Sequence, residues 1–129
     1  MTNNFFKHET AIIETDNIGE GTKIWAFTHI CKGARIGKNC TIGEGVYIGP
    51  DVIIGDNCKI QNGALLYKGV EIGNNVFIGP GVVTTNDYFP RLPVDDWSHR
   101  FKKTIIDDNS SIGANSTIIC GCTIGKYSM

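Results

Sequence analysis

The stretch that decides the fold is IGKNCTIGEGVYIGPDVIIGDNC, residues 36–58. Ile recurs in it at every sixth position, and a small or β-branched residue follows four positions after each Ile. An amphipathic helix repeats every 3.6 residues and a strand every 2, so neither element explains a period of six. A short strand that ends in a sharp corner does explain it. In that arrangement Ile points inward, the small residue fills the corner, and Gly stands where the backbone is unusual or closely approached.

The same period extends outward in both directions. Starting at Ile12, twelve consecutive marks fall on Ile or Leu and end at Ile78, and four more run from Ile106 to Ile124. Three hexads that close a triangular coil would stack each residue on its partner 18 positions away, at the strand spacing of about 4.8 Å. The sequence therefore predicts an all-β parallel β-helix, a solenoid in which each coil contacts only its neighbours.

The repeat is interrupted once. We predict a single domain over residues 1–129, with repeats at 12–83 and 106–129 and a loop insertion at 84–105. The insertion holds four aromatic residues and two of the four Pro residues, whereas a flexible linker is rich in Gly and Ser. Loops of this length usually serve a function, and in an oligomer this one could close a cleft on a neighbouring subunit.

Composition excludes several classes of protein. The 12 Lys and Arg residues nearly balance the 13 Asp and Glu residues, which argues against a polybasic surface binder. No apolar run approaches the roughly 20 residues of a membrane span, and the first residues lack the blocks of a signal peptide, so a cytoplasmic protein is expected. The five Cys residues are expected to be free and structural, with Cys40, Cys58 and Cys122 in the small inner sites.

Departures from the repeat indicate where a binding site lies. The residue after each mark is Gly at nine of sixteen marks, and Trp25, Gln61 and Tyr67 are among the exceptions. Stacking by 18 puts these three on neighbouring rows that run into the insertion, with Asn62 beside them. We therefore predict that they gather on one edge of the prism. Packing of large side chains at a corner is the alternative interpretation.

Hexads such as Ile36-Gly37-Lys38-Asn39-Cys40 and Ile112-Gly113-Ala114-Asn115-Ser116 resemble those of the left-handed β-helix hexapeptide-repeat family. The resemblance implies the left hand of the coil, a homotrimer with active sites at its subunit interfaces, and acyl transfer from coenzyme A.

One branch of this family is a closer match. The segments Ile60-Gln61-Asn62, Leu66-Tyr67-Lys68, Thr84-Thr85-Asn86 and Pro90-Arg91 are similar to those of enzymes that acetylate the amino group of nucleotide-linked aminosugars. That similarity implies acetyl-CoA as co-substrate, a dTDP-3-amino-3,6-dideoxyhexose as acceptor, and a role in bacterial cell-surface polysaccharide biosynthesis, including that of lipopolysaccharide.

The resemblance also implies a set of site residues. Asn86 would accept a hydrogen bond from the neutral amine and aim its lone pair, although a turn residue at the exit of a strand is the alternative. Asp87 would accept a proton or cap the turn. In hexapeptide-repeat transferases generally a His often acts as base, for which His99 in the insertion is the candidate, whereas the aminosugar branch has no obvious side-chain base. Coenzyme A would lie near Gly79, Gly113 and Ala114. The expected substrate contacts are Trp25, His29, Gln61, Asn62, Tyr67 and Arg91.

The same fold is compatible with three other functions. A γ-class carbonic anhydrase needs three His ligands around zinc, but of His8, His29 and His99 only His29 lies on the prism, so no metal site is expected. An O-acetyltransferase acting on another small acceptor would need a base to activate the hydroxyl. A non-catalytic trimeric module of a larger protein is favoured by the stop at Met129, inside a hexad, where relatives continue with coils that help to hold coenzyme A.

Overall fold

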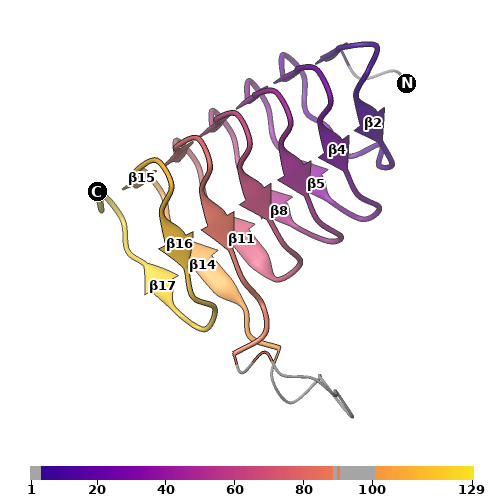
Figure 1. The fold of residues 1–129 in the computed structure, drawn as a ribbon. Coiled ribbons are helices and arrows are strands. Elements are labelled where there is room, and N and C mark those ends of the chain that lie inside the picture. The colour runs from indigo at the N-terminus through magenta and orange to yellow at the C-terminus, as the bar shows by residue number, and fades with distance from the viewer. Residues whose placement is uncertain (1–3, 89, 91–100) are drawn as a thin grey trace.

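The computed structural model describes residues 4–88, 90 and 101–129. Over these residues the chain forms short parallel strands, with no helix, and the strands stack into a solenoid of about six turns (Figure 1). The predicted all-β parallel β-helix is therefore confirmed, and the structure is consistent with a left-handed coil. The described part of the chain contains no helix long and apolar enough to cross a membrane.

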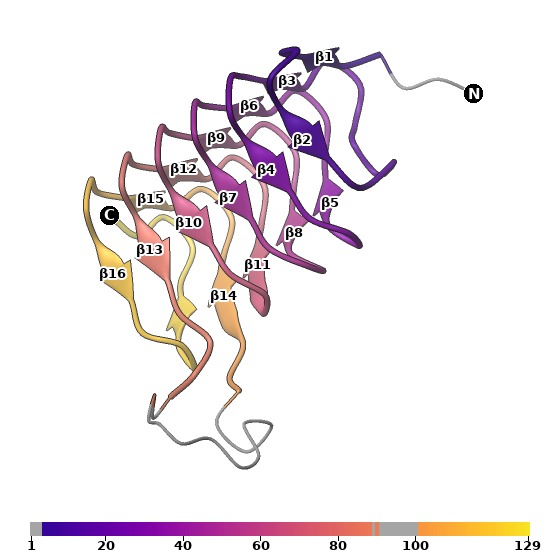
Figure 2. The same ribbon diagram turned by 45° about the vertical axis from the view of Figure 1, so that its right-hand side comes forward.

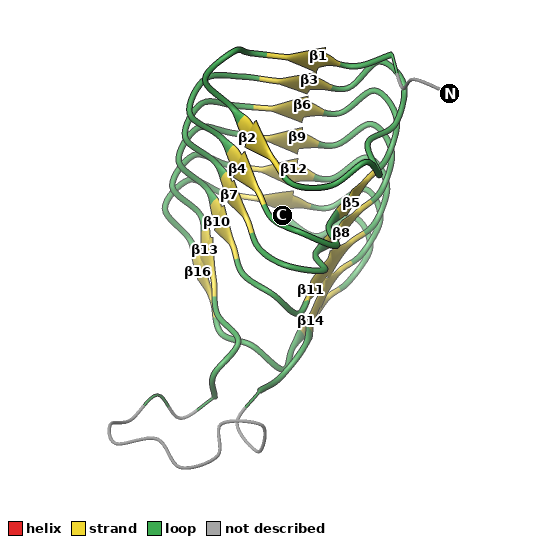
Figure 3. Ribbon diagram, turned by 90° about the vertical axis from the view of Figure 1, so that its right-hand side faces the viewer, coloured by secondary structure: helices red, strands yellow, loops and turns green. Residues whose placement is uncertain are grey.

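Three sheets form the three walls of a prism (Figure 3). Sheet A contains β1 (Phe6–Lys7), β3 (Lys23–Ile24), β6 (Thr41–Ile42), β9 (Lys59–Ile60), β12 (Phe77–Ile78) and β15 (Ser111–Ile112). Sheet B contains β2 (Ile12–Ile13), β4 (His29–Ile30), β7 (Tyr47–Ile48), β10 (Leu65–Leu66), β13 (Val83–Thr84) and β16 (Thr117–Ile118). Sheet C contains β5 (Arg35–Ile36), β8 (Ile53–Ile54), β11 (Val70–Ile72), β14 (Thr104–Ile106) and β17 (Thr123–Ile124). We call the turns from sheet A to sheet B the A–B corner, and those from sheet B to sheet C the B–C corner.

The register between coils is the predicted one through the middle of the prism (Figure 2). Ile42 pairs with Ile60, and Ile60 with Ile78, each 18 positions apart. All three side chains are fully buried on the prism axis, and Val46, Val52 and Val76 fill the corners beside them. This stack of aliphatic side chains is the hydrophobic core.

The first coil differs from the prediction by one residue. Ile13, not Ile12, pairs with Ile30, and the Ile12 side chain is 59% exposed. The predicted first inward position at Ile12 is therefore wrong. The cause is a coil of 17 residues, in which Ala11 fills the small corner and the Thr10 hydroxyl accepts a hydrogen bond from the Phe27 amide.

The interrupted coil is also more regular than expected. Thr84 is fully buried in β13, in the inward row that Ile occupies elsewhere, and it pairs with Ile118. Thr104 begins β14 and pairs with Val70, 34 positions away instead of 18, so this coil carries 16 additional residues. Strands therefore occupy both ends of the 84–105 segment. Its base is closed by an antiparallel bridge between Asp87 and Phe101.

The corners require a left-handed backbone at one position of each hexad. The residue three positions after each inward residue has φ between 56° and 105° from Gly21 to Gly81 and again from Asn109 to Tyr127. Gly, Asn and Asp tolerate this conformation and hold most of these positions. Phe27, at φ 60°, is a bulky exception.

The five Cys residues are free, as predicted. Cys40 and Cys58 lie in the small inner sites, and each thiol donates a hydrogen bond across 3.1 Å to a carbonyl of the next coil. Cys122 was expected in the same row but is exposed, because no later coil of the described chain lies over it.

Candidate active site at the base of the insertion

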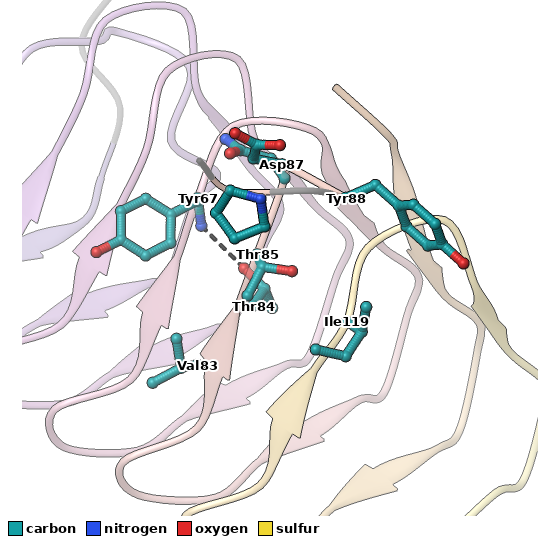
Figure 4. A pocket seen from close by; sticks show the side chains of 9 residues that line it. Tyr67, Val83, Thr84, Thr85, Asp87, Tyr88 and Ile119 are labelled. Carbon is teal, nitrogen blue, oxygen red and sulfur yellow. Dashed lines mark hydrogen bonds between the residues drawn. The ribbon is translucent and has the colours of Figure 1, made fainter. Parts of the chain in front are cut away.

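A cleft of about 310 Å³ opens at the B–C corner, where the insertion leaves β13 (Figure 4). Val83 and Thr84 of β13 and the following Thr85 line it, together with the exposed Ile119 after β16. The full lining consists of Tyr67, Val83, Thr84, Thr85, Asn86, Asp87, Tyr88, Pro90 and Ile119.

Two hydroxyl groups fix the floor of the cleft. The Thr84 Oγ1 atom accepts a hydrogen bond from the Tyr67 amide at 3.0 Å, which is drawn as the dashed line in Figure 4. Thr85 Oγ1 accepts one from the Cys120 amide at 3.0 Å and donates to the carbonyl of Ile118 at 3.3 Å. These bonds tie three successive coils together, so the chain that continues into the insertion starts from a rigid platform.

Asn86 is held in a defined orientation. Its side-chain Nδ2 donates a hydrogen bond to the Lys68 backbone carbonyl at 3.1 Å. The backbone carbonyl of Asn86 accepts a hydrogen bond from the Lys102 amide at 3.0 Å. When the NH₂ group of an amide is bound to a backbone carbonyl, its oxygen is the atom that remains to accept a hydrogen bond. The half-buried Asn86 side chain is therefore preset as a hydrogen-bond acceptor.

Asp87 and Tyr67 lie on either side of this position. Asp87 is half-buried and belongs to the bridge with Phe101 that closes the base of the insertion. Tyr67 is 39% exposed, and its ring lies 5.4 Å from that of Tyr47 on the preceding coil. The predicted residues Asn86, Asp87 and Tyr67 thus meet in one cleft.

Other predicted contacts lie elsewhere. Trp25, Gln61 and Asn62 follow strands of sheet A and sit at the A–B corner, whereas Tyr67 follows a strand of sheet B. The prediction that they share one edge with Tyr67 is therefore wrong, because consecutive hexads of one coil face different corners. Trp25 packs its ring 5.0 Å from that of Phe6, and Asn62 Oδ1 accepts a hydrogen bond from the Glu44 amide.

His29 also lies outside the cleft. It stands on sheet B in the predicted row with Tyr47 and Leu65, and Val83 of the cleft comes three coils later. Its ring nitrogen Nε2 is 3.0 Å from Glu14 Oε1.

The three residues predicted to hold coenzyme A are brought together at the A–B corner. A Cβ atom added to Gly79 would lie 2.7 Å from the Ala114 amide nitrogen and 2.9 Å from the Gly113 carbonyl carbon. Gly79 is therefore required for the contact between coils. Gly113 and Ala114 are exposed, so their backbone is open to a ligand. Arg91 and His99 lie outside the described residues.

The cleft includes residues that sequence reasoning did not assign to a site. The predicted repeat segment ends at Val83, Thr84 and Thr85 begin the predicted insertion, and Tyr88 and Pro90 belong to its aromatic and Pro content. Ile119 could have been assigned to a site from the sequence, because it replaces the Gly that usually follows the inward residue.

Comparison with known proteins agrees with this architecture. The family model described as bacterial transferase hexapeptide (six repeats) matches residues 17–50 and 51–86, and that of the hexapeptide repeat of succinyl-transferase matches 103–128. A curated relative from Aneurinibacillus thermoaerophilus, dTDP-3-amino-3,6-dideoxy-alpha-D-galactopyranose 3-N-acetyltransferase, is 51% identical over 124 residues. The match covers 96% of this chain but 64% of the relative, so the chain spans somewhat less than two thirds of that protein's length.

Among solved structures, a mutant of perosamine N-acetyltransferase from Caulobacter crescentus, in complex with CoA and GDP-perosamine, aligns with a TM-score of 0.43 and 16% identity. The alignment covers 98% of this chain and 50% of that one. The two matches to the six-repeat model take up more than half of the 129 residues. The chain belongs to the bacterial transferase hexapeptide family.

Proposed function

We propose that this chain acts as an acetyl-CoA-dependent N-acetyltransferase on the 3-amino group of a dTDP-linked 3-amino-3,6-dideoxyhexose. The observation that carries the proposal is the preset acceptor of Asn86 in an apolar cleft, within a chain 51% identical to a 3-N-acetyltransferase for such a sugar. The biological setting that fits this acceptor is bacterial cell-surface polysaccharide biosynthesis in the cytoplasm.

The chemistry needs a neutral amine next to a thioester carbonyl. The amine nitrogen bonds to the carbonyl carbon, the carbon–sulfur bond breaks, and the nitrogen loses one proton as the thiolate of coenzyme A gains one. Asn86 Oδ1 would accept a hydrogen bond from the amine and so aim its lone pair at the carbonyl. Holding two reactants in this geometry supplies much of the rate enhancement. Asp87 would receive the proton or fix the turn that carries Asn86.

The lining of the cleft suits a deoxy sugar. Val83, Ile119 and the ring of Tyr67 offer apolar surface to the C–H face and the methyl group of a 6-deoxyhexose, and the exposed Tyr88 extends this surface toward the solvent.

The proposal also gives roles to predicted site residues that are not part of the cleft described above. Gly113 and Ala114 would lie against coenzyme A, and Arg91 would pair with the pyrophosphate, to which a guanidinium group is well matched. His99 would be available as a base from the insertion. Trp25, Gln61 and Asn62 share the A–B corner with Gly113, so in a homotrimer they would reach the acceptor from a neighbouring subunit.

The test is release of the coenzyme A thiol from acetyl-CoA by the purified chain, with a panel of dTDP- and UDP-linked 3- and 4-aminosugars. Turnover with a dTDP-linked 3-amino sugar is expected. An O-acetyltransferase would instead respond to a hydroxyl acceptor and depend on a His base. No turnover on the whole panel, from a folded trimer, would favour a non-catalytic module.

A further inference from the structure

A second cluster of reactive side chains lies near the N-terminal end of sheet B, away from the cleft. It consists of Glu14, His29 and Cys31, which come from two successive coils. Their ligand atoms all lie within 4.8 Å of one another. Neither the cleft nor the acetyl transfer proposed above uses these residues as a group.

The geometry is convergent. His29 Nε2 lies 3.0 Å from Glu14 Oε1 and 3.8 Å from Cys31 Sγ. A catalytic relay of Cys, His and a carboxylate uses one ring nitrogen for the thiol and the other for the carboxylate. Here the same nitrogen faces both partners, so the three atoms surround a common point and do not form a chain.

The distances suit a tetrahedral metal ion. Zinc binds imidazole nitrogen and carboxylate oxygen at about 2.0–2.2 Å and thiolate sulfur at about 2.3 Å. At tetrahedral angles the nitrogen and oxygen are then about 3.4 Å apart, and the nitrogen and sulfur about 3.6 Å. The separations in the structure are 3.0 Å and 3.8 Å, so small side-chain rotations would complete the geometry.

The surroundings favour a bound ion. Tyr47 on the next coil packs its ring edge-on to His29, at 5.8 Å between centroids. The Tyr47 hydroxyl also hydrogen-bonds to Cys31, as an outer partner that can stabilise a thiolate. The Cys31 residue is 7% exposed, whereas the side chains of His29 and Glu14 are 41% and 48% exposed. The cluster is thus walled by protein on one side and open to solvent on the other.

We propose that Glu14, His29 and Cys31 form a binding site for one zinc ion per chain, with a fourth position open to water or a ligand. One imidazole, one carboxylate and one thiolate match the donors that zinc prefers. Glu14 belongs to the shortened first coil, and His29 and Cys31 belong to the second. The bound ion would therefore link the first coil to the second and stabilise their contact.

The experiment is a titration of the purified chain with Co²⁺ as a spectroscopic probe, followed by Zn²⁺ competition and a metal count after equilibrium dialysis. We expect one ion per chain and a thiolate-to-cobalt charge-transfer band in the near ultraviolet. Zn²⁺ should displace the cobalt and raise the thermal midpoint of unfolding.

Matched variants separate this site from other thiols and imidazoles. Cys31→Ser should abolish the charge-transfer band, and His29→Gln and Glu14→Gln should each weaken binding at least tenfold. Cys122→Ser removes an exposed thiol and His8→Gln an imidazole outside the cluster, and both should bind as the unchanged chain does. Because Cys31 is buried and its variant can disturb folding, the exposed His29→Gln provides the decisive second test, with folding checked by circular dichroism.

A stoichiometry well below one ion per chain would overturn the proposal. So would a charge-transfer band that survives in Cys31→Ser or disappears in Cys122→Ser, or an affinity that is unchanged in a folded His29→Gln. The acetyl-transfer assay is independent of these readouts, so either proposal can fail without the other.

Discussion

At the scale of single residues, the same amino acid serves different needs in different rows of the prism. Gly45 has φ +67° and no atom near the place where a Cβ would stand. Gly49 has ordinary backbone angles, but its Cβ would lie 2.9 Å from the Lys68 amide nitrogen and 3.1 Å from the Leu66 carbonyl oxygen. The first Gly is required by conformation and the second by the contact between coils.

This difference predicts two unequal effects of one substitution. Gly45→Ala should lower the free energy of unfolding by about 1–2 kcal/mol, the cost of a left-handed L-residue. Gly49→Ala should lower it by at least about 3 kcal/mol, because two backbones must separate. Urea denaturation of both variants measures the effects, and equal losses would contradict the distinction.

Asn86 is the residue whose side chain bears most directly on the proposed reaction. On the proposed mechanism, Asn86→Ala should lower kcat at least tenfold, because the amine would lose the acceptor that aims it, while the proposed trimer is retained. Asn86→Asp keeps an acceptor oxygen but loses the donor to the Lys68 carbonyl, so it should retain more activity than the Ala variant. Acetyl-transfer kinetics and gel filtration are the measurements, and wild-type rates in a trimeric Asn86→Ala would exclude this role.

At the scale of the elements, strands β13 and β14 carry the insertion and hold two buried Thr residues. Thr84 uses its hydroxyl twice, as acceptor for the Tyr67 amide and as donor to the Leu65 carbonyl at 3.4 Å. The Thr104 hydroxyl is equally buried and has no hydrogen-bond partner among the described residues. Burial without a partner is unfavourable for a hydroxyl group.

Replacement by Val, which has nearly the same shape, should therefore act in opposite directions. Thr84→Val should lower the free energy of unfolding by about 1–3 kcal/mol, because the Tyr67 amide loses its acceptor. Thr104→Val should leave it unchanged or raise it by up to about 1 kcal/mol. Thermal unfolding of the two variants tests this, and a loss of stability in Thr104→Val would mean that its hydroxyl is satisfied in solution.

At the scale of the whole molecule, the prism is a one-dimensional stack in which each coil contacts the coil above and the coil below. Ile60 lies in the middle and is fully buried between Ile42 and Ile78. Ile124 lies in the last described coil and is only partly buried. A cavity at position 60 is enclosed by the coils above and below, whereas one at position 124 opens toward solvent.

The position along the stack should therefore control the effect of a truncated core side chain. Ile60→Ala should lower the free energy of unfolding by about 2–5 kcal/mol, and Ile124→Ala by less than about 1 kcal/mol. Chemical denaturation followed by circular dichroism checks both values. Similar losses at the two positions would indicate that Ile124 is covered in solution, as it would be by further chain or by a partner.

Much of the fold was accessible from the sequence, and less of the site. The period of six identified the inward row from Ile24 to Ile78, since each hexad repeats the same local geometry. Tyr67 is predicted because it interrupts that pattern beside the insertion, whereas Asn86 and Asp87 are predicted from the family resemblance. Trp25 and Gln61 interrupt it as well, yet they lie on another corner. Stacking by 18 separates the row of Trp25 and Gln61 from that of Tyr67, and rows six positions apart lie at different corners of the prism.

The sequence by itself determined the coil, because Ile, the small corner residue and Gly act within a single hexad and leave a mark at every repeat. The tertiary structure alone decided which side chains meet where a coil departs from 18 residues. Glu14 comes within 3.0 Å of His29, 15 positions away, because the first coil is one residue short. The pairing between the first and second coils is therefore shifted by one residue. Such a shift changes every contact between two coils while leaving the pattern inside each hexad intact, so only the stacked chain reveals it.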